Sequence, residues 1–80
     1  MTRTEIEEKV RAFLLDEMEI DEDSLYPKSR LKEDMGIDSL DFVDIVVIVD
    51  KHFGFKIKPD EMAEVKTLSQ FVDYIESKVK

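Results

Sequence analysis

Asp34-Met35-Gly36-Ile37-Asp38-Ser39-Leu40-Asp41 is the stretch near the middle of the chain where a polar loop changes into a long apolar segment. Gly36 suits a tight turn, because glycine has no side-chain penalty at positive φ. Asp38 and Ser39 both carry oxygens that accept hydrogen bonds from the unpaired amides of a first helical turn. The stretch therefore predicts a helix that starts here, with one hydroxyl at its beginning.

The segment that follows, residues 39–53, contains a conflict between propensity and context. Its run Val46-Val47-Ile48-Val49 is β-branched and, taken alone, indicates a buried strand. A helix is favoured by the capping residues, by the length of the segment and by Gly54 as a stop signal. The chain also offers no convincing partner strand, so we predict a helix.

Three further helices are expected around this one. Thr4 and Glu7 have capping-box spacing and open a first helix that ends near Glu17. Thr67 and Gln70 have the same spacing and open the last one. The core stripes of these two helices are Ile6, Val10, Phe13 and Leu14 in the first, and Leu68, Phe71, Val72, Ile75 and Val79 in the last.

A short helix and a long loop complete the expected fold. Lys58-Pro59-Asp60-Glu61 opens a short helix, since proline is tolerated in the first turn. The long loop joins the first and second helices over residues 18–37, and it is expected to be pinned to the core by Leu25, Tyr26 and Leu31. The fold class is therefore all-α: a small four-helix bundle of three main helices and one short helix.

Composition narrows the class of protein. Eighty residues make a single domain, 1–80, and the absence of cysteine excludes disulfides and thiolate-bound metal. A net charge of −8 argues against nucleic acid and favours partners with basic patches. The N-terminus lacks a secretory signal, and no apolar run approaches the roughly 20 residues of a membrane span. We expect a cytoplasmic monomer without a membrane span.

The second helix carries apolar residues on two sides. Its core face is expected to contain Phe42, Ile45, Val46, Val49 and Phe53. Leu40, Val43 and Val47 fall on nearly the opposite side, edged by Asp44 and Asp50. Such an exposed strip indicates docking of a partner. In the alternative, the three residues pack beneath the long loop or the short helix.

An enzyme built on Ser39 is excluded by distance. A serine nucleophile needs a base within hydrogen-bond reach, and the single histidine, His52, lies 13 residues along the same helix, roughly 20 Å away. No metal site is expected either. The run that starts at Asp21 begins like a calcium loop, but Tyr26 stands where that loop needs glycine.

The octapeptide resembles the attachment motif of acyl carrier proteins, and the resemblance extends over essentially the whole chain. It implies that Ser39, flanked by Gly36, Asp38 and Leu40, carries a 4'-phosphopantetheine arm. A phosphopantetheinyl transferase would add the arm from coenzyme A, at a helix start whose amides and dipole stabilise a phosphodiester. The arm would hold acyl groups as thioesters, so the chain itself is a carrier without catalytic activity.

The resemblance also implies which residues meet partner enzymes, namely Asp38, Leu40, Asp41, Val43, Asp44 and Val47. Asp38 is explained as a contact for the modifying enzyme. The expected partners are fatty acid synthase-type enzymes or related acyl transferases with basic docking patches. An alternative is a specialised carrier for polyketide, peptide or D-alanyl transfer, and a further one is an unmodified acidic helical adaptor.

The chain departs from the family pattern at two places. Lys51 and His52 stand where the family commonly continues with glutamates, so the acidic face is shorter. Phe42 is bulkier than the usual residue next to the motif and is expected to limit the acyl cavity. Both departures concern which partners and which cargo the carrier accepts.

Overall fold

The computed structural model describes residues 1–79, with Ser39 described through its backbone alone. The helices are α1 (Arg3–Asp16), the 3-10 turn η1 (Glu22–Ser24), α2 (Ser39–Phe53), α3 (Pro59–Met62) and α4 (Leu68–Val79). Over these residues the backbone forms no strand, apart from one isolated bridge between Arg30 and Thr67. The prediction of an all-α bundle with three main helices and one short helix is confirmed.

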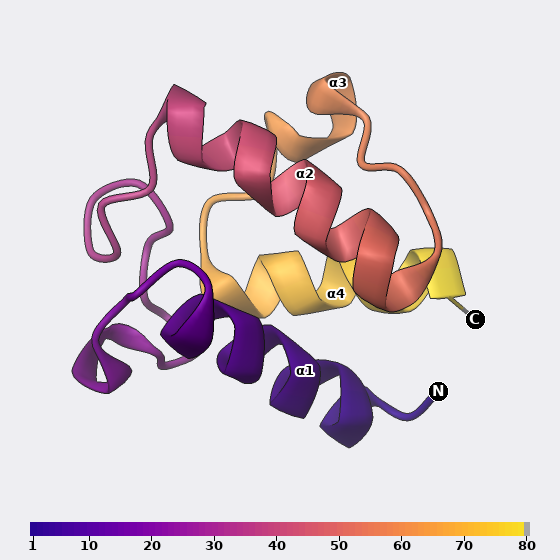
Figure 1. The fold of residues 1–80 in the computed structure, drawn as a ribbon, viewed down its shortest axis with the longest axis horizontal. Helices are drawn as coiled ribbons and strands as arrows, with labels where there is room; N and C mark the ends of the chain where they lie inside the picture. Colours follow the sequence, from indigo (N-terminus) through magenta and orange to yellow (C-terminus); the bar gives the residue numbers. More distant parts are fainter. Residues whose placement is uncertain (80) are drawn as a thin grey trace.

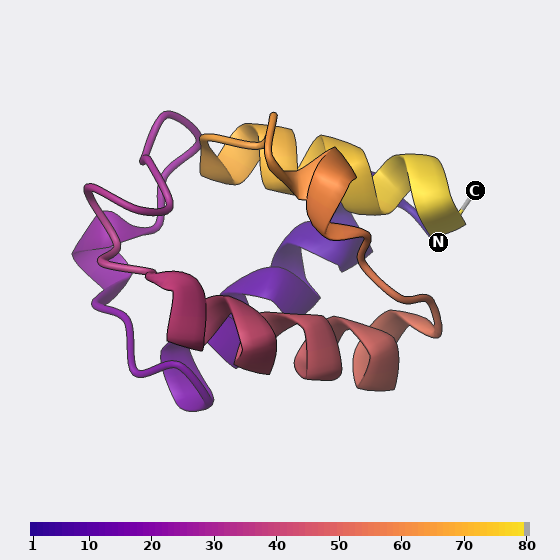
Figure 2. The ribbon, with the colours of Figure 1, turned by 90° about the horizontal axis from the view of Figure 1, so that it is seen from above.

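The helices surround one core (Figure 1). α1 and α4 pack side by side, and α2 lies across from them. In the view from above, α3 overlaps α4, and α2 lies on the opposite side of the picture (Figure 2). The beginning of α1 and the end of α4 lie at the same end of the molecule, where Arg3 forms ion pairs with Asp73 and Glu76.

The core takes apolar side chains from all four α-helices and from the loops between them. The predicted stripes of the first and last helices are buried, except that Val79 is only partly covered. In α2, Ile45 and Val49 are buried, whereas Phe42, Val46 and Phe53 are partly buried. The buried hydrophobic side chains are Ile6, Val10, Phe13, Leu14, Leu25, Leu31, Met35, Ile37, Ile45, Ile48, Val49, Ile57, Met62, Leu68, Phe71, Val72 and Ile75.

Ile48 is buried although the predicted core face of α2 does not include it. One side of α2 faces α1, where His52 reaches Glu17 at the end of that helix. The other side faces α3 across a cavity that Phe42 helps to line. Because neighbours cover α2 from two directions, its buried arc is wider than the single stripe of a surface helix.

The start of α1 lies earlier than predicted. The capping box is formed by Thr2 and Glu5, not by Thr4 and Glu7: the Thr2 hydroxyl accepts from the Glu5 amide at 3.2 Å, and Glu5 accepts from the Thr2 amide at 3.2 Å. Both pairs have the same spacing, so sequence alone did not separate them. The Thr2–Glu5 pair adds helical residues before Ile6, so that this buried side chain lies inside the helix.

Backbone hydrogen bonds fix the loop between α1 and α2 against the segment before α4. The Leu31 amide donates to Lys66 and the Leu68 amide donates to Ser29, each at 2.9 Å. Leu25 and Leu31 are buried as predicted, but the prediction for Tyr26 is wrong, because 47% of it is exposed. The loop is thus held by its backbone and by buried side chains that include Leu25 and Leu31.

The end of α2 resolves the conflict over its β-branched run. Val46 to Val49 are helical, and the helix ends at Gly54, which adopts the left-handed conformation at φ 78°. The predicted pairing of Thr67 and Gln70 is also confirmed, since each side chain accepts a hydrogen bond from the other's amide at 3.2 Å. In α2, the residues that cap and end the helix outweigh the strand propensity of the β-branched run.

Candidate functional site

The beginning of α2 is built by two aspartates. The Asp38 carboxylate accepts hydrogen bonds from the amides of Leu40 at 2.9 Å and Asp41 at 3.0 Å. In return, the Asp41 carboxylate accepts from the Asp38 amide at 3.3 Å, which completes a capping box. The helix start is therefore fixed by the same residues that the sequence singled out for chemistry.

This capping box confirms that Asp38 caps α2, as the sequence predicted, whereas its contact with a modifying enzyme stays a prediction. The sequence interpretation also expected the first-turn amides to stabilise a phosphodiester. In the structure the Asp38 carboxylate already engages two of those amides, at Leu40 and Asp41. The first function of Asp38 is thus to cap α2, and an added phosphate would gain less from these amides than predicted.

The turn before α2 is rigidly arranged. Gly36 adopts φ 72°, as predicted, and no other side chain crowds the position of its missing Cβ. The Asp34 carboxylate accepts from the Arg30 amide at 2.8 Å, and this hydrogen bond, with help from the Arg30 guanidinium, holds the pKa of Asp34 below its ordinary value. Met35 and Ile37 are buried on either side of the glycine, so the turn is anchored to the core.

Ser39 is the first residue of α2, between the exposed residues Asp38 and Leu40. Its side chain lies outside the described part of the structure, so its role as an attachment point stays a prediction. The exposure of both neighbours leaves this end of the helix accessible to another protein.

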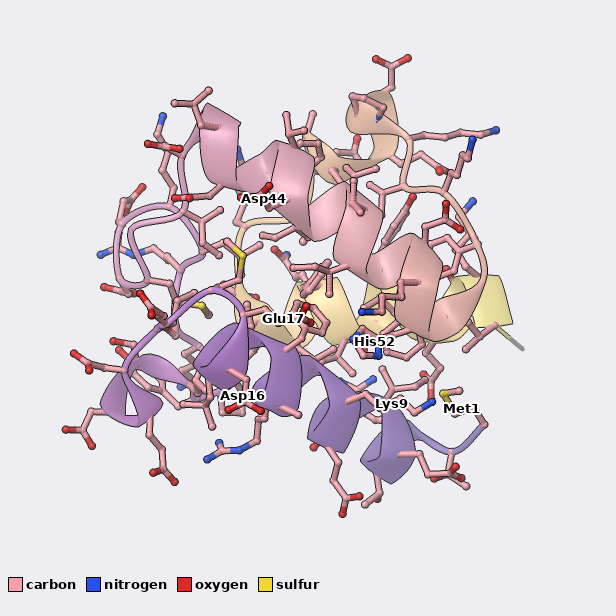
Figure 3. All side chains as sticks on the ribbon, in the orientation of Figure 1. Met1, Lys9, Asp16, Glu17, Asp44 and His52 are labelled. Carbon is pink, nitrogen blue, oxygen red and sulfur yellow. The ribbon has the colours of Figure 1, made fainter. Side chains whose placement is uncertain are left out.

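His52 lies at the opposite end of α2, far from Ser39. Its Nε2 atom is 3.3 Å from Oε2 of Glu17, and its ring stacks on Phe13 at 6.0 Å between ring centres. Figure 3 shows His52 and Glu17 in the space between α2 and α1. His52 therefore joins two helices, and thirteen residues of helix, about 20 Å, separate it from Ser39.

A strip of exposed apolar side chains runs along the outer face of α2. Leu40 is 80% exposed, Val43 59% and Val47 63%. The alternative that these residues pack beneath a loop or α3 is wrong. Asp44 is exposed on one edge of the strip, while Asp41 and Asp50 are half-buried. We call Leu40, Val43 and Val47 the outer strip.

A cavity of about 600 Å³ opens beside the start of α2, between α2, α3 and the preceding loop. Phe42 and Ile45 line it from α2, Met62 lines it from α3, and Ile37 lines it from the turn. Asp38 stands at its edge, so the cavity reaches the residue next to Ser39. The sequence predicted that Phe42 lies beside such a space, but it did not predict the contribution of α3. The available signal was Met62, an apolar residue three positions after Pro59.

Within residues 1–79 no three His, Cys, Asp or Glu side chains gather closely enough to hold an ion. None of the helices in the same range combines the length and apolar character needed to cross a membrane.

The fold and the motif define a class of carrier domain, and comparisons with known proteins agree. The family model described as "Phosphopantetheine attachment site" matches residues 8–75. The chain is 34% identical to an acyl carrier protein of Thermosynechococcus vestitus over 79 residues, 99% of this chain and 98% of the relative. It is 33% identical to one of Thermotoga maritima, over 98% of this chain and 96% of the relative. An acyl carrier protein of Chlorobium phaeobacteroides is 32% identical over 98% of this chain and its own full length.

The chain thus belongs to the acyl carrier protein family. Its cofactor is 4'-phosphopantetheine, covalently attached, and the protein is a carrier without catalytic activity of its own. Its partners include a phosphopantetheinyl transferase and enzymes that handle acyl groups. The residues present fit the cofactor, because an accessible helix start lies next to a mostly apolar cavity.

Proposed function

We propose that residues 1–80 form one carrier domain in which Ser39 bears the 4'-phosphopantetheine arm, and that it delivers acyl intermediates in cytoplasmic fatty acid biosynthesis. The observation that carries the proposal is the position of Ser39. It is the first residue of α2, between exposed neighbours and next to the cavity that Asp38 borders. The match to the phosphopantetheine attachment family covers this position.

The residues around Ser39 prepare it for modification by another enzyme. The capping box of Asp38 and Asp41 fixes the backbone on both sides of the serine, and the Gly36 turn sets its approach to the core. The hydroxyl of Ser39 would attack the phosphorus of coenzyme A that carries the pantetheine, and its proton would pass to a base of the transferase. The new phosphodiester forms as the pyrophosphate bond breaks and adenosine 3',5'-bisphosphate leaves. The bound cofactor supplies a thiol that holds acyl groups as thioesters.

The cavity beside α2 offers shelter for an acyl chain. Its lining is mostly apolar, and a volume of about 600 Å³ lies within the range of small-molecule sites. Phe42 lies in its wall close to Asp38, so its ring limits the space nearest the attachment point. A smaller side chain there, as in Phe42→Leu, should raise the protection of long acyl thioesters from hydrolysis relative to short ones.

Partner enzymes are proposed to dock on Asp38, Asp41, Asp44 and the outer strip. The strip supplies an apolar centre, and the carboxylates supply a polar rim, which is the usual anatomy of a protein interface. The substitutions Asp41→Lys and Asp44→Lys should therefore slow partner reactions without unfolding the domain. Asp44→Lys leaves the capping box intact, whereas Asp41→Lys also removes the hydrogen bond to the Asp38 amide and should lower stability. Unchanged rates in both variants would remove this surface from consideration.

Loading of the serine tests the proposed function directly. The protein is incubated with coenzyme A, Mg²⁺ and a broad-specificity phosphopantetheinyl transferase, and its intact mass is measured. One phosphopantetheine is expected on the wild-type chain and none on Ser39→Ala. A folded wild-type protein that stays unmodified would overturn the proposal, and modification of Ser39→Ala would place the attachment elsewhere.

A second candidate is a specialised carrier for polyketide, peptide or D-alanyl transfer. It is favoured by Lys51 and His52, which shorten the acidic face of α2, and by the bulk of Phe42 at the cavity. Loading by a transferase is common to both candidates. Transfer assays with malonyl, aminoacyl and D-alanyl donors, together with the identity of neighbouring genes, separate them.

A further inference from the structure

The charges along α2 and the following loop change sign from one end to the other. Residues 38–44 contain three carboxylates and no cation, whereas residues 45–58 contain one carboxylate and three lysines. The protein as a whole carries a net charge of −8, so a lysine-rich segment is a local exception. The reversal takes place along the helix that carries the outer strip.

Lys51 belongs to the same face as the outer strip. It follows Val47 by four residues, and residues four apart lie one above the other on a helix. Asp44 precedes Lys51 by seven residues, two turns of helix, which places the two side chains on one edge about 10 Å apart. Both are exposed, and neither takes part in any ion pair within residues 1–79. Figure 3 labels Asp44 on the first half of α2.

We infer that the docking face is bipolar: the phosphopantetheinyl transferase that docks on it places a cation opposite Asp44 and a carboxylate opposite Lys51. The inference rests on the proposed function, because it assigns the partner's charge at the same docking surface. A uniformly basic partner would meet Lys51 with repulsion, since a separation of about 10 Å is comparable with the screening length of physiological salt. Complementary charges at both ends would fix which way round the partner sits on α2.

Lys51 also has a local role, because a cation in the last turn of a helix suits the helix dipole. If Lys51 had this local role alone, replacing it would lower the stability of the domain but would not change the rate at which the partner docks. Binding kinetics therefore distinguish the two roles, with thermal unfolding of each variant as the check on folding.

The test uses the phosphopantetheinyl transferase of the source organism as the partner and measures kcat/KM for loading of the full chain. The variants are Lys51→Glu, Lys51→Gln, Asp44→Lys and the exchange Asp44→Lys/Lys51→Glu. Lys28→Glu is the matched control, because Lys28 is exposed in the loop before α2 and the change in net charge equals that of Lys51→Glu. The exchange variant keeps the net charge of the wild type and reverses only the order of the two signs.

A bipolar partner predicts that Lys51→Glu lowers kcat/KM at least about fivefold, Lys51→Gln lowers it less, and the exchange variant lowers it most. Lys28→Glu should stay within twofold of the wild type. Equal or faster loading of Lys51→Glu relative to Lys28→Glu would overturn the inference while the proposed function stands. Failure of the wild-type chain to load at all would overturn both, so the two failures are distinct.

Discussion

Asp38 shows how one residue combines folding and function. Its carboxylate holds the amides of Leu40 and Asp41, and its backbone precedes the proposed attachment serine. The aspartate before the serine therefore serves as a helix cap whether or not a partner also contacts it. Because the Asp38 side chain is already ordered by the cap, it loses less conformational entropy when a partner contacts its exposed side.

The two functions of Asp38 are separable by substitution. Asp38→Ala removes the cap and should lower the free energy of unfolding by about 1 kcal/mol. For a domain of this size that corresponds to a drop in Tm of roughly 4–8 °C. Asp38→Asn keeps an oxygen acceptor and should stay near the wild-type Tm. Circular dichroism melts measure both.

The variants Asp38→Ala and Asp38→Asn also test whether the transferase recognises the charge of Asp38. If the charge of Asp38 is also contacted, Asp38→Asn loads more slowly than the wild type although it melts at the same temperature. Equal stability of Asp38→Ala and the wild type would contradict the capping role.

At the scale of a secondary-structure element, α2 has two apolar faces with different purposes. Val49 is fully buried in the core, whereas Val47 is 63% exposed on the outer strip. These two valines lie two residues apart on one helix, so replacing either by alanine changes helix propensity by the same amount. The two substitutions therefore differ only in burial, and they separate the effect of core packing from the effect of docking.

Val49→Ala should lower the free energy of unfolding by about 2 kcal/mol, because it removes two buried methyl groups and leaves a cavity. Val47→Ala should change it by less than about 0.5 kcal/mol. Urea denaturation measures both values. Partner reactions should respond in the opposite order, with Val47→Ala slower than Val49→Ala once both are folded. A large loss of stability in Val47→Ala would mean that the outer strip packs within the molecule.

The extent to which sequence determines this fold differs between elements. The core stripes of α1 and α4 follow from periodicity, and the start of α2 follows from Gly36, Asp38 and Ser39. Ile48 was missed because a helical wheel does not show how many neighbours cover a helix. The wrong start of α1 arose because Thr2 and Thr4 offer equivalent spacings.

The site was predictable where it depends on local chemistry and not where it depends on tertiary contacts. The octapeptide located the helix start, and the helical projection of residues 39–53 located the outer strip. The backbone bonds from Leu31 and Leu68 that hold the long loop carry no side-chain signal. The sequence therefore assigned that task to side chains alone, and among them Tyr26 is exposed. The cavity between α2 and α3 likewise exists only once Met62 is placed beside Phe42.

At the scale of the whole molecule, exposed ion pairs tie the helices together. Glu61 of α3 accepts from Lys78 of α4 at 3.0 Å and from the Tyr74 hydroxyl at 3.0 Å. The Lys78 hydrogen bond, followed by that of Tyr74, holds the pKa of Glu61 below its ordinary 4.5. The pKa of Lys78 is correspondingly raised by Glu61.

These shifts give a signed prediction for the dependence of stability on pH. A lowered pKa of Glu61 stabilises the fold above pH 4.5, and this contribution is lost as the pH falls below that value. Glu61→Gln should therefore lower the Tm at pH 7 and reduce the fall in Tm at acidic pH, the acid limb of the Tm–pH curve. Glu64→Gln, at an exposed carboxylate of the same region, is the control. An acid limb that is unchanged in Glu61→Gln would show that this pair does not link α3 to α4.

The net charge of −8 acts against these local attractions over the whole surface. Twenty acidic residues on a chain of 80 repel one another at neutral pH, and salt screens that repulsion. Raising NaCl from low salt to about 0.5 M should therefore increase Tm, although the exposed pairs at Glu61 and Arg3 weaken. Glu8→Gln/Glu64→Gln, which removes two exposed charges, should melt higher than the wild type at low salt and gain less from NaCl. A Tm that falls with added NaCl would mean that the ion pairs outweigh the overall repulsion, and in that case the double variant should be less stable than the wild type.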